Sequence, residues 1–392
     1  MAELSKLDGE INGRTEQLEG FSAELRSWLD ANEQDAPLPA AIEGLDDEGV
    51  ERRRQWQAKL AHAGYIGVTW PSDYGGSDGT PAESVAVALE LDSRGLAGPL
   101  DFIGVDIIGP TLLAHGNPEQ KERLLPPILR AEEMWCQLLS EPGAGSDLAA
   151  IKTRARQQGD GTWVVDGQKV WTSFAHLATF GFLLARTEDD GPKHGGLTAF
   201  IVPMEADGVT IRPLRQISGD AEFNEVFLDG VRLPADAVIG GIGDGWRILL
   251  TMLGFERMAV GSGLVAVQVD RLGLALAEAA PDRCAEVRLG RTASELIALR
   301  HMGLRIARGV ANGVVPGPDA GLVKITTVTA SLAACRLAVD ALGPSALFES
   351  EWGHQVSTLP GIRSASGTEE IIRNVIGERV LGLPAEPRVA TK

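Results

Sequence analysis

The stretch that decides the fold is Trp135-Cys136-Gln137-Leu138-Leu139-Ser140-Glu141-Pro142-Gly143-Ala144-Gly145-Ser146-Asp147. It begins as an apolar run that suits a buried strand, which Pro142 ends because proline lacks a backbone donor. Gly143 and Gly145 allow the backbone either to take positive φ or to approach a ligand closely. The stretch therefore predicts either an ordinary Gly-Pro turn or a loop whose N–H groups and hydroxyls bind a polar, partly anionic cofactor. A Rossmann fingerprint is excluded, because Leu148 occupies the place of its third glycine.

A second stretch, residues 162–173, reads Thr-Trp-Val-Val-Asp-Gly-Gln-Lys-Val-Trp-Thr-Ser. Asp166-Gly167 lies between two β-type runs and predicts a type I′ hairpin turn. The second run closes with Trp171, Thr172 and Ser173, an indole followed by two hydroxyls. A flat apolar wall beside hydroxyl donors suits a planar heteroaromatic ring with polar edges.

These two stretches, in this order and about twenty residues apart, resemble the flavin-binding signature of the acyl-CoA dehydrogenases. The resemblance extends over nearly the whole chain. Further matching motifs are Trp70-Pro71, Tyr74-Gly75-Gly76, Asn224 to Asp229, Gly245-Trp246, Glu256-Arg257, Gly367-Thr368 and Glu378 to Pro384.

The pattern of apolar residues predicts an α+β multidomain fold in three parts. Residues 1–133 carry helical periodicity and form an N-terminal all-α domain. Residues 134–238 contain short strand-like runs separated by turns, which predict a small antiparallel β-barrel or sandwich with Asp229-Gly230 at its last hairpin. Residues 239–392 contain long Ala/Leu-rich segments that predict a four-helix bundle. The same three-part architecture is implied by the resemblance.

Composition excludes several functions. The net charge of −18 argues against non-specific binding to nucleic acid or to an anionic membrane. Three widely spaced cysteines suit a reducing cytoplasm, and the scattered histidines predict no metal site. The first residues resemble neither a signal nor a transit peptide. No stretch of about 18 uncharged apolar residues predicts a membrane span.

The resemblance implies dehydrogenation of an acyl-CoA thioester to the trans-2-enoyl-CoA. A carboxylate abstracts the α-proton, FAD accepts the β-hydride, and an electron-transferring flavoprotein reoxidises the FAD. It also implies which residues of this chain contact FAD. They are Gln137, Leu139, Ser140, Gly145, Ser146, Trp171, Ser173, Thr368 and Glu370. Thr368 also suits a helix N-cap, and both roles can hold together.

This sequence departs from the family pattern at the catalytic base. Many members carry a Glu directly before the Gly-Thr pair, where this chain has Ser366. A minority place the base on an earlier helix, in a Glu-Arg pair that matches Glu256-Arg257. Glu256 has apolar helical neighbours, so it is either a buried ion-pair member or the catalytic base. Arg257 is then expected to bind the substrate or CoA, and the backbone N–H of Ser366 to bind the thioester oxygen.

Two further departures concern the contact between subunits. No Phe-Gly pair follows Arg283 or Arg288 in residues 281–288, and Asp340 stands where the family often has a Gln that touches the adenosine end of FAD. Such a chain resembles the actinobacterial sterol and fatty acyl-CoA dehydrogenases, some of which pair a catalytic with a degenerate subunit. We therefore expect a homo-oligomer, as a tetramer or dimer, or a hetero-oligomer with a related chain. A non-catalytic subunit and a flavoenzyme with other chemistry are the alternatives.

Overall fold

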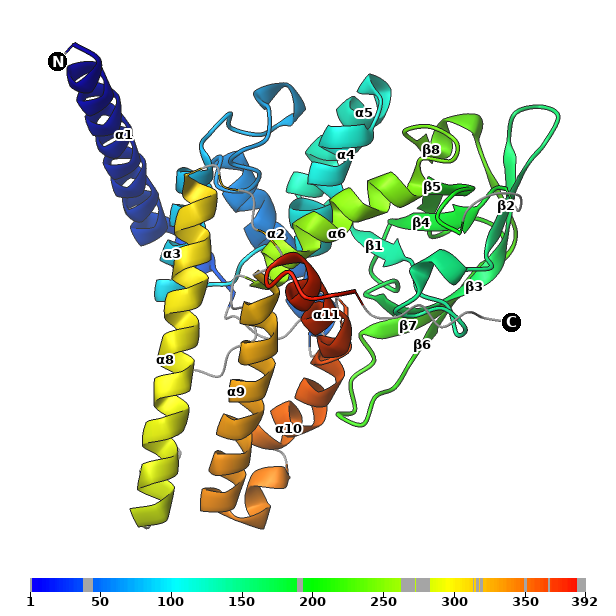
Figure 1. The fold of residues 1–392 in the computed structure, drawn as a ribbon. Helices are drawn as coiled ribbons and strands as arrows, with labels where there is room; N and C mark the ends of the chain where they lie inside the picture. Colours follow the sequence, from blue (N-terminus) through cyan, green and yellow to red (C-terminus); the bar gives the residue numbers. More distant parts are fainter. Residues whose placement is uncertain are drawn as a thin grey trace. The chain divides into compact units, whose positions relative to one another are not determined.

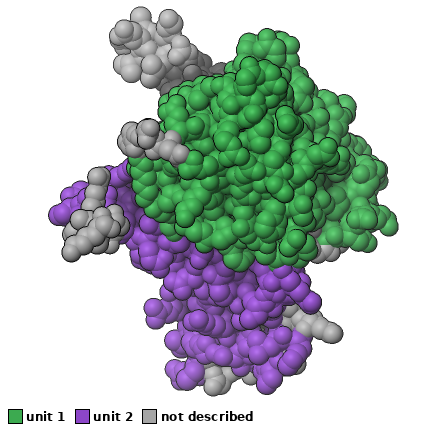
Figure 2. Space-filling model, turned by 90° about the vertical axis from the view of Figure 1, so that its right-hand side faces the viewer, with its two compact units in different colours: residues 1–214, 221–252, 310–314 green, residues 215–220, 253–309, 315–392 purple. Residues whose placement is uncertain are grey.

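The computed structural model describes residues 2–37, 45–188, 193–261, 272, 283–312, 314, 317, 320–348, 351–365 and 367–385. The chain folds as two compact units, coloured separately in Figure 2. Unit 1 comprises Met1–Leu214, Ala221–Met252 and Val310–Val314, and unit 2 comprises Arg215–Asp220, Leu253–Gly309 and Val315–Lys392. The helical, β and helical parts follow one another along the chain as the sequence predicts, whereas the domain boundaries at 133/134 and 238/239 stay a prediction.

Unit 1 begins with helices that confirm the predicted N-terminal helical part (Figure 1). They are α1 (Ala2–Asn32), α2 (Asp47–His62), α3 (Pro81–Ser93), the π-helical turn η4 (Gly104–Ile108), α4 (Gly109–His115) and α5 (Pro118–Leu129). Thr80 and Asn117 begin α3 and α5 as capping boxes, each with proline at the first helical positions. These caps satisfy backbone N–H groups that a helix start leaves unpaired, so the local sequence fixes both starts.

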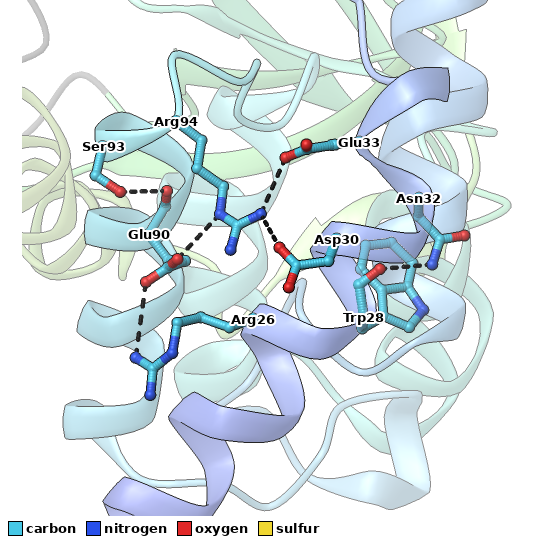
Figure 3. Close-up of polar contacts among 8 residues, drawn as sticks. All are labelled: Arg26, Trp28, Asp30, Asn32, Glu33, Glu90, Ser93 and Arg94. Atoms are coloured by element: carbon cyan, nitrogen blue, oxygen red, sulfur yellow. Dashed lines mark hydrogen bonds and ion pairs between the residues drawn. The ribbon is translucent and has the colours of Figure 1, made fainter.

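A guanidinium joins the end of α1 to α3 (Figure 3). The Arg94 side chain donates to Asp30 at 2.7 Å, to Glu33 at 2.9 Å and to Glu90 at 3.0 Å. Arg26 approaches Glu90 from α1 at 4.0 Å. Because most of these carboxylates are exposed, each pair adds little stability, and the cluster chiefly fixes where α1 ends.

The β part of unit 1 is one eight-stranded sheet with the order β6-β7-β3-β2-β4-β5-β8, in which β1 pairs with β4. It is mainly antiparallel as expected, with parallel pairing of β4 to β1 and β2. The strands are β1 (Trp135–Leu138), β2 (Arg154–Gln157), β3 (Trp163–Ser173), β4 (Phe180–Arg186), β5 (Leu197–Pro203), β6 (Val209–Pro213), β7 (Phe223–Leu233) and β8 (Val238–Ile239).

The predicted hairpin turns at Asp166-Gly167 and Asp229-Gly230 are wrong. Both pairs lie inside the long strands β3 and β7, which pair with each other through a register shift at this point. The Gly230 N–H donates to the Asp166 carboxylate at 2.8 Å, and Gly230 takes φ of 63°. A Cβ on Gly167 would lie 2.3 Å from Thr153 Oγ1. The glycines are therefore required by a bulge and by close packing.

Unit 2 contains the later helices, which confirm the helical C-terminal part. They are α6 (Gly245–Gly261), whose first half belongs to unit 1, α8 (Arg283–Ala311), α9 (Ala320–Leu342), α10 (Glu351–Ile362) and α11 (Glu369–Arg379). Residues 262–282 of the predicted bundle lie outside the described residues, apart from residue 272. The sequence missed α10, which contains Pro360.

Helix α9 is the core of unit 2. Within the described residues it is the one helix long and apolar enough to cross a membrane, although 61% of its most apolar window is buried inside the protein. Its partners come from α8 and α10, so its apolar composition suits a core helix. The cluster around it includes Leu296, Ala334, Leu337, Trp352 and Leu359.

Candidate functional site

A buried ammonium holds the loop that follows β1. Lys169 lies on β3 and is fully buried. Its Nζ donates to the carbonyl oxygens of Leu139 at 3.0 Å and Leu184 at 2.9 Å, and to the Glu141 carboxylate at 3.0 Å. All three ammonium hydrogens can thus be satisfied without water, which a buried charge requires. The loop is therefore fixed to the strand that carries Trp171.

Glu141 is the second charged group of this cluster. Its carboxylate accepts hydrogen bonds from the backbone N–H of Lys152 at 2.7 Å and of Thr153 at 2.9 Å. Burial acts to raise the pKa of Glu141, but the Lys169 ammonium and these donors outweigh it and hold the pKa below its ordinary value. Glu141 and Ala144 also exchange two backbone hydrogen bonds of 3.0 Å, which close a tight turn. These hydrogen bonds define the shape of the turn.

The glycines of the loop leave space beside it. Neither Gly143 nor Gly145 takes positive φ, so that part of the sequence-based explanation is wrong. A Cβ built on either residue meets no protein atom within 4 Å. The open space at both glycines would allow close approach of a ligand, and it is also compatible with an ordinary turn. Ser146 is exposed beside Gly145, and the Val170 N–H donates to the Ser140 carbonyl at 2.9 Å.

Trp171 is held in an unusual conformation at the end of β3. Its φ is 60°, a backbone conformation that bulky L residues disfavour. It is also 60% exposed, which is high for a large apolar residue. The pairing of β3 with β7 shifts between Lys169 and Thr172, which turns the indole out of the sheet. Its ring forms a T-shaped contact with Phe223, at 5.9 Å and 81°. The indole is therefore accessible next to Ser173, and a backbone outlier of this kind makes the position a candidate for function.

Gln137 completes this group from β1. Its side-chain nitrogen lies 3.7 Å from the sulfur of Met252. The structure thus brings together seven of the predicted cofactor residues on β1, its following loop and the end of β3, all within unit 1. They are Gln137, Leu139, Ser140, Gly145, Ser146, Trp171 and Ser173.

Sequence analysis missed the two residues that hold this group in place, Glu141 and Lys169. Both stand in the quoted stretches. The available signal was a Lys on the apolar strand run that ends at Trp171, and a Glu directly after the apolar run of β1. Charges at such positions are costly unless they are paired with each other.

The predicted base lies in unit 2. Glu256 is on α6 and is 9% exposed. Its carboxylate interacts electrostatically with the ammonium of Lys324 on α9. The side chain of Arg257 and the whole of Ser366 lie outside the described residues, so their predicted contacts with substrate stay predictions.

The start of α11 also lies in unit 2. Thr368 is its N-cap, and its side chain accepts a hydrogen bond from the Ile371 N–H at 3.3 Å. The N-cap role is therefore confirmed, whereas its contact with the cofactor stays a prediction. Glu370 is exposed in the first turn, where hydrogen bonds from its own backbone N–H and from the Thr368 side chain lower the pKa of its carboxyl. A carboxylate in the first turn also competes with an anion for that helix end.

Asp340, one of the departures from the family pattern, forms an ion pair. Its carboxylate accepts from the Arg288 guanidinium at 2.6 Å, between α9 and α8. Both side chains are about half exposed. Within unit 2, Arg288 is thus bound by Asp340.

Comparison with known proteins matches family models along nearly the whole chain. The acyl-CoA dehydrogenase N-terminal, middle and C-terminal domains match residues 15–132, 136–231 and 243–381. The acyl-CoA dehydrogenase IpdE1 of Mycobacterium tuberculosis is 40% identical over 389 residues, which cover 95% of this chain and 100% of that protein.

Two solved structures of protein pairs are also similar. The Tcur3481-Tcur3483 steroid ACAD has a TM-score of 0.77 and 28% identity, with 95% of this chain and 98% of that chain covered. The ChsE4-ChsE5 complex from Mycobacterium tuberculosis has a TM-score of 0.74 and 26% identity, with 94% and 98% covered.

Proposed function

Because the chain belongs to the acyl-CoA dehydrogenase family, we propose that it oxidises an acyl-CoA thioester to the trans-2-enoyl-CoA with FAD as cofactor and Glu256 as base. Family membership makes it an oxidoreductase, and the members of this family are flavoproteins. The electrons are proposed to pass to an electron-transferring flavoprotein, and the enzyme to act in the cytoplasm.

The observation that carries the proposal is the buried carboxylate of Glu256 in a chain with Ser at position 366. A base that abstracts an α-proton must be shielded from water so that its proton affinity approaches that of the activated carbon. Glu256 meets this condition. The Arg257 side chain would hold the CoA or the acyl end, and the Ser366 N–H would donate to the thioester oxygen as negative charge develops there.

The residues of unit 1 fit a flavin. The exposed indole of Trp171 offers an apolar face to a planar ring, and the hydroxyls of Ser140 and Ser173 offer hydrogen bonds at its edges. The open space beside Gly143 and Gly145 admits a ligand against the backbone. When bound, FAD supplies the acceptor for the β-hydride. Thr368 and Glu370 are proposed to contact it from the start of α11.

The loop assignment predicts that Gly145→Leu releases FAD. Because a Cβ at this position meets no protein atom, the variant should fold, and its side chain should occupy the ligand's space. FAD per chain, measured by absorbance after gel filtration, is expected to fall at least about tenfold, as roughly 1.4 kcal/mol of lost binding would produce. Gly159→Leu, also on open space in an exposed turn, is the matched control. Full FAD occupancy in Gly145→Leu would show that the loop does not bind the cofactor.

Anaerobic reduction of the bound flavin tests the reaction. The purified yellow protein is mixed with octanoyl-CoA, cyclohexane-1-carbonyl-CoA and cholanoyl-CoA, and bleaching is followed by absorbance. Bleaching by an acyl-CoA is expected. A colourless protein would indicate a non-catalytic subunit, and a protein bleached only by added dithionite would indicate other chemistry. Either result would overturn the proposal. We expect cholanoyl-CoA to react best, because one similar structure is a steroid ACAD.

We propose that the protein acts as an oligomer, either as a homo-tetramer or homo-dimer or together with a related chain. Unit 2 exposes large apolar side chains that oligomerisation would bury, among them Val287, Phe348 and Leu381. The similarity to the Tcur3481-Tcur3483 steroid ACAD and to the ChsE4-ChsE5 complex supports a mixed assembly. Light scattering of an FAD-loaded, active monomer would contradict this.

A further inference from the structure

Lys324 is the buried ammonium of unit 2. It lies on α9, is 7% exposed, and donates hydrogen bonds to the carbonyl oxygens of Ala365 and Gly367. These two carbonyls flank position 366 in the loop before α11. Burying an ammonium group costs free energy unless its partners are charged or well aligned. An exposed loop could fold without such a buried lysine. The desolvation cost of Lys324 therefore suggests that this loop has to be held in one conformation.

Two carboxylates act on the same ammonium. Burial lowers the pKa of Lys324, and the charges of Glu256 and Glu369 oppose that shift. Glu369 has strong partners of its own, because Arg363 donates to both its oxygens at 3.1 and 3.0 Å and Arg373 lies 3.8 Å away. Glu256 lies on a different helix, α6, and is equally shielded from water. Lys324 is therefore a positive charge that acts on the proposed base and on the loop at once.

The hydrogen bond from Lys324 to the Ala365 carbonyl also restricts the N–H group of the same peptide. In a planar trans peptide the C=O of one residue and the N–H of the next belong to one rigid group and point in opposite directions. The Ala365 carbonyl shares its group with the N–H that would bind the thioester oxygen. A lysine that fixes this carbonyl also fixes the direction of that donor. A misplacement of about 1 Å at a reacting centre can cost about a hundredfold in rate.

We propose that Lys324 is a positioning residue that orients the loop before α11 for the proton abstraction. This inference rests on the proposed function. Lys324 takes up no proton and touches no reacting atom in it. It sets the direction of the backbone donor through the carbonyl groups of Ala365 and Gly367.

Two substitutions test this role. Lys324→Met removes the charge and the hydrogen bonds at similar length, and Lys324→Arg keeps a cationic donor while changing the geometry. In Lys324→Met we expect flavin reduction by cholanoyl-CoA or octanoyl-CoA to slow about 10- to 100-fold. Lys324→Arg should recover part of that rate, because it keeps a charged donor for the carbonyls of Ala365 and Gly367.

Amide hydrogen exchange of residues 361–370 in the FAD-loaded protein gives a readout that does not depend on activity. It should become faster in Lys324→Met, with a smaller change in Lys324→Arg. A Lys324→Met protein with the wild-type rate per FAD and wild-type exchange would overturn the inference. So would reduced thermal stability with the rate per FAD unchanged, which is what a purely structural lysine predicts. If no acyl-CoA reduces the wild type, the proposed function fails, whereas unchanged exchange in Lys324→Met refutes the positioning role separately.

Discussion

Glu256→Gln is expected to keep the fold and bound FAD but to reduce flavin reduction by an acyl-CoA on the order of 10²–10⁴-fold or more. The substitution removes the charge with little change in volume, so the buried site on α6 stays filled. An amide cannot accept the α-proton. The measurement is single-turnover absorbance under anaerobic conditions, because it isolates the chemical step from reoxidation.

Glu286→Gln is the matched control, since Glu286 is an exposed carboxylate on α8. It should behave as the wild type. Turnover at the wild-type rate in Glu256→Gln would remove Glu256 as the base and leave it as a buried charge partner. Recovery of activity by Ser366→Glu in the Glu256→Gln background would support two interchangeable base positions, as the resemblance implies for the family.

Lys169→Met is expected to lower the free energy of unfolding by about 3–5 kcal/mol, because it leaves the Glu141 carboxylate buried without its cation. It also removes the hydrogen bonds to the carbonyls of Leu139 and Leu184. The loop after β1 would lose its attachment to β3, so FAD occupancy should fall together with stability. Urea titration and flavin absorbance measure the two effects.

A second substitution, Glu141→Gln, tests whether the unpaired carboxylate causes the loss of stability in Lys169→Met. Gln at position 141 is neutral and still presents an oxygen to the N–H groups of Lys152 and Thr153. Lys169→Met combined with Glu141→Gln should therefore recover a large part of the lost stability, since no unpaired charge remains. Stability of Lys169→Met equal to that of the wild type would show that the pair contributes nothing.

Local sequence was sufficient for the order of the helical and β parts and for many individual elements. Helical periodicity predicted the N-terminal helical part, which contains α2, α3 and α5. Their capping residues are local signals as well, because the groups that start a helix lie within four residues of one another. The apolar run at Trp135 predicted β1 in the same way. Recognition of the flavin motif also needed only residues close together in the sequence.

Pairing between strands that are distant in the sequence explains why the predicted turn was wrong. Asp166-Gly167 has the composition of a turn, yet its outcome depended on β7, more than fifty residues later, which pairs across it. The conformation of Trp171 depended on the same pairing, because the bulge between Lys169 and Thr172 exists only when β7 is present. Turn propensity is a local preference of a fraction of a kcal/mol to about 1 kcal/mol, and a long ladder of hydrogen bonds overrides it.

The sequence by itself determined the family, the three-part fold and the candidate residues Glu256, Trp171 and the Ser140–Ser146 loop. Tertiary structure alone decided which charges are paired. Lys169 lies 28 residues from Glu141, and Lys324 lies 41 and 43 residues from the carbonyls it binds. Burial makes such pairs strong by removing water, and burial is a property of the packed protein. A local pattern could show that Lys169 and Glu141 are charges beside apolar runs, but only the packed protein shows which groups the two buried lysines bind.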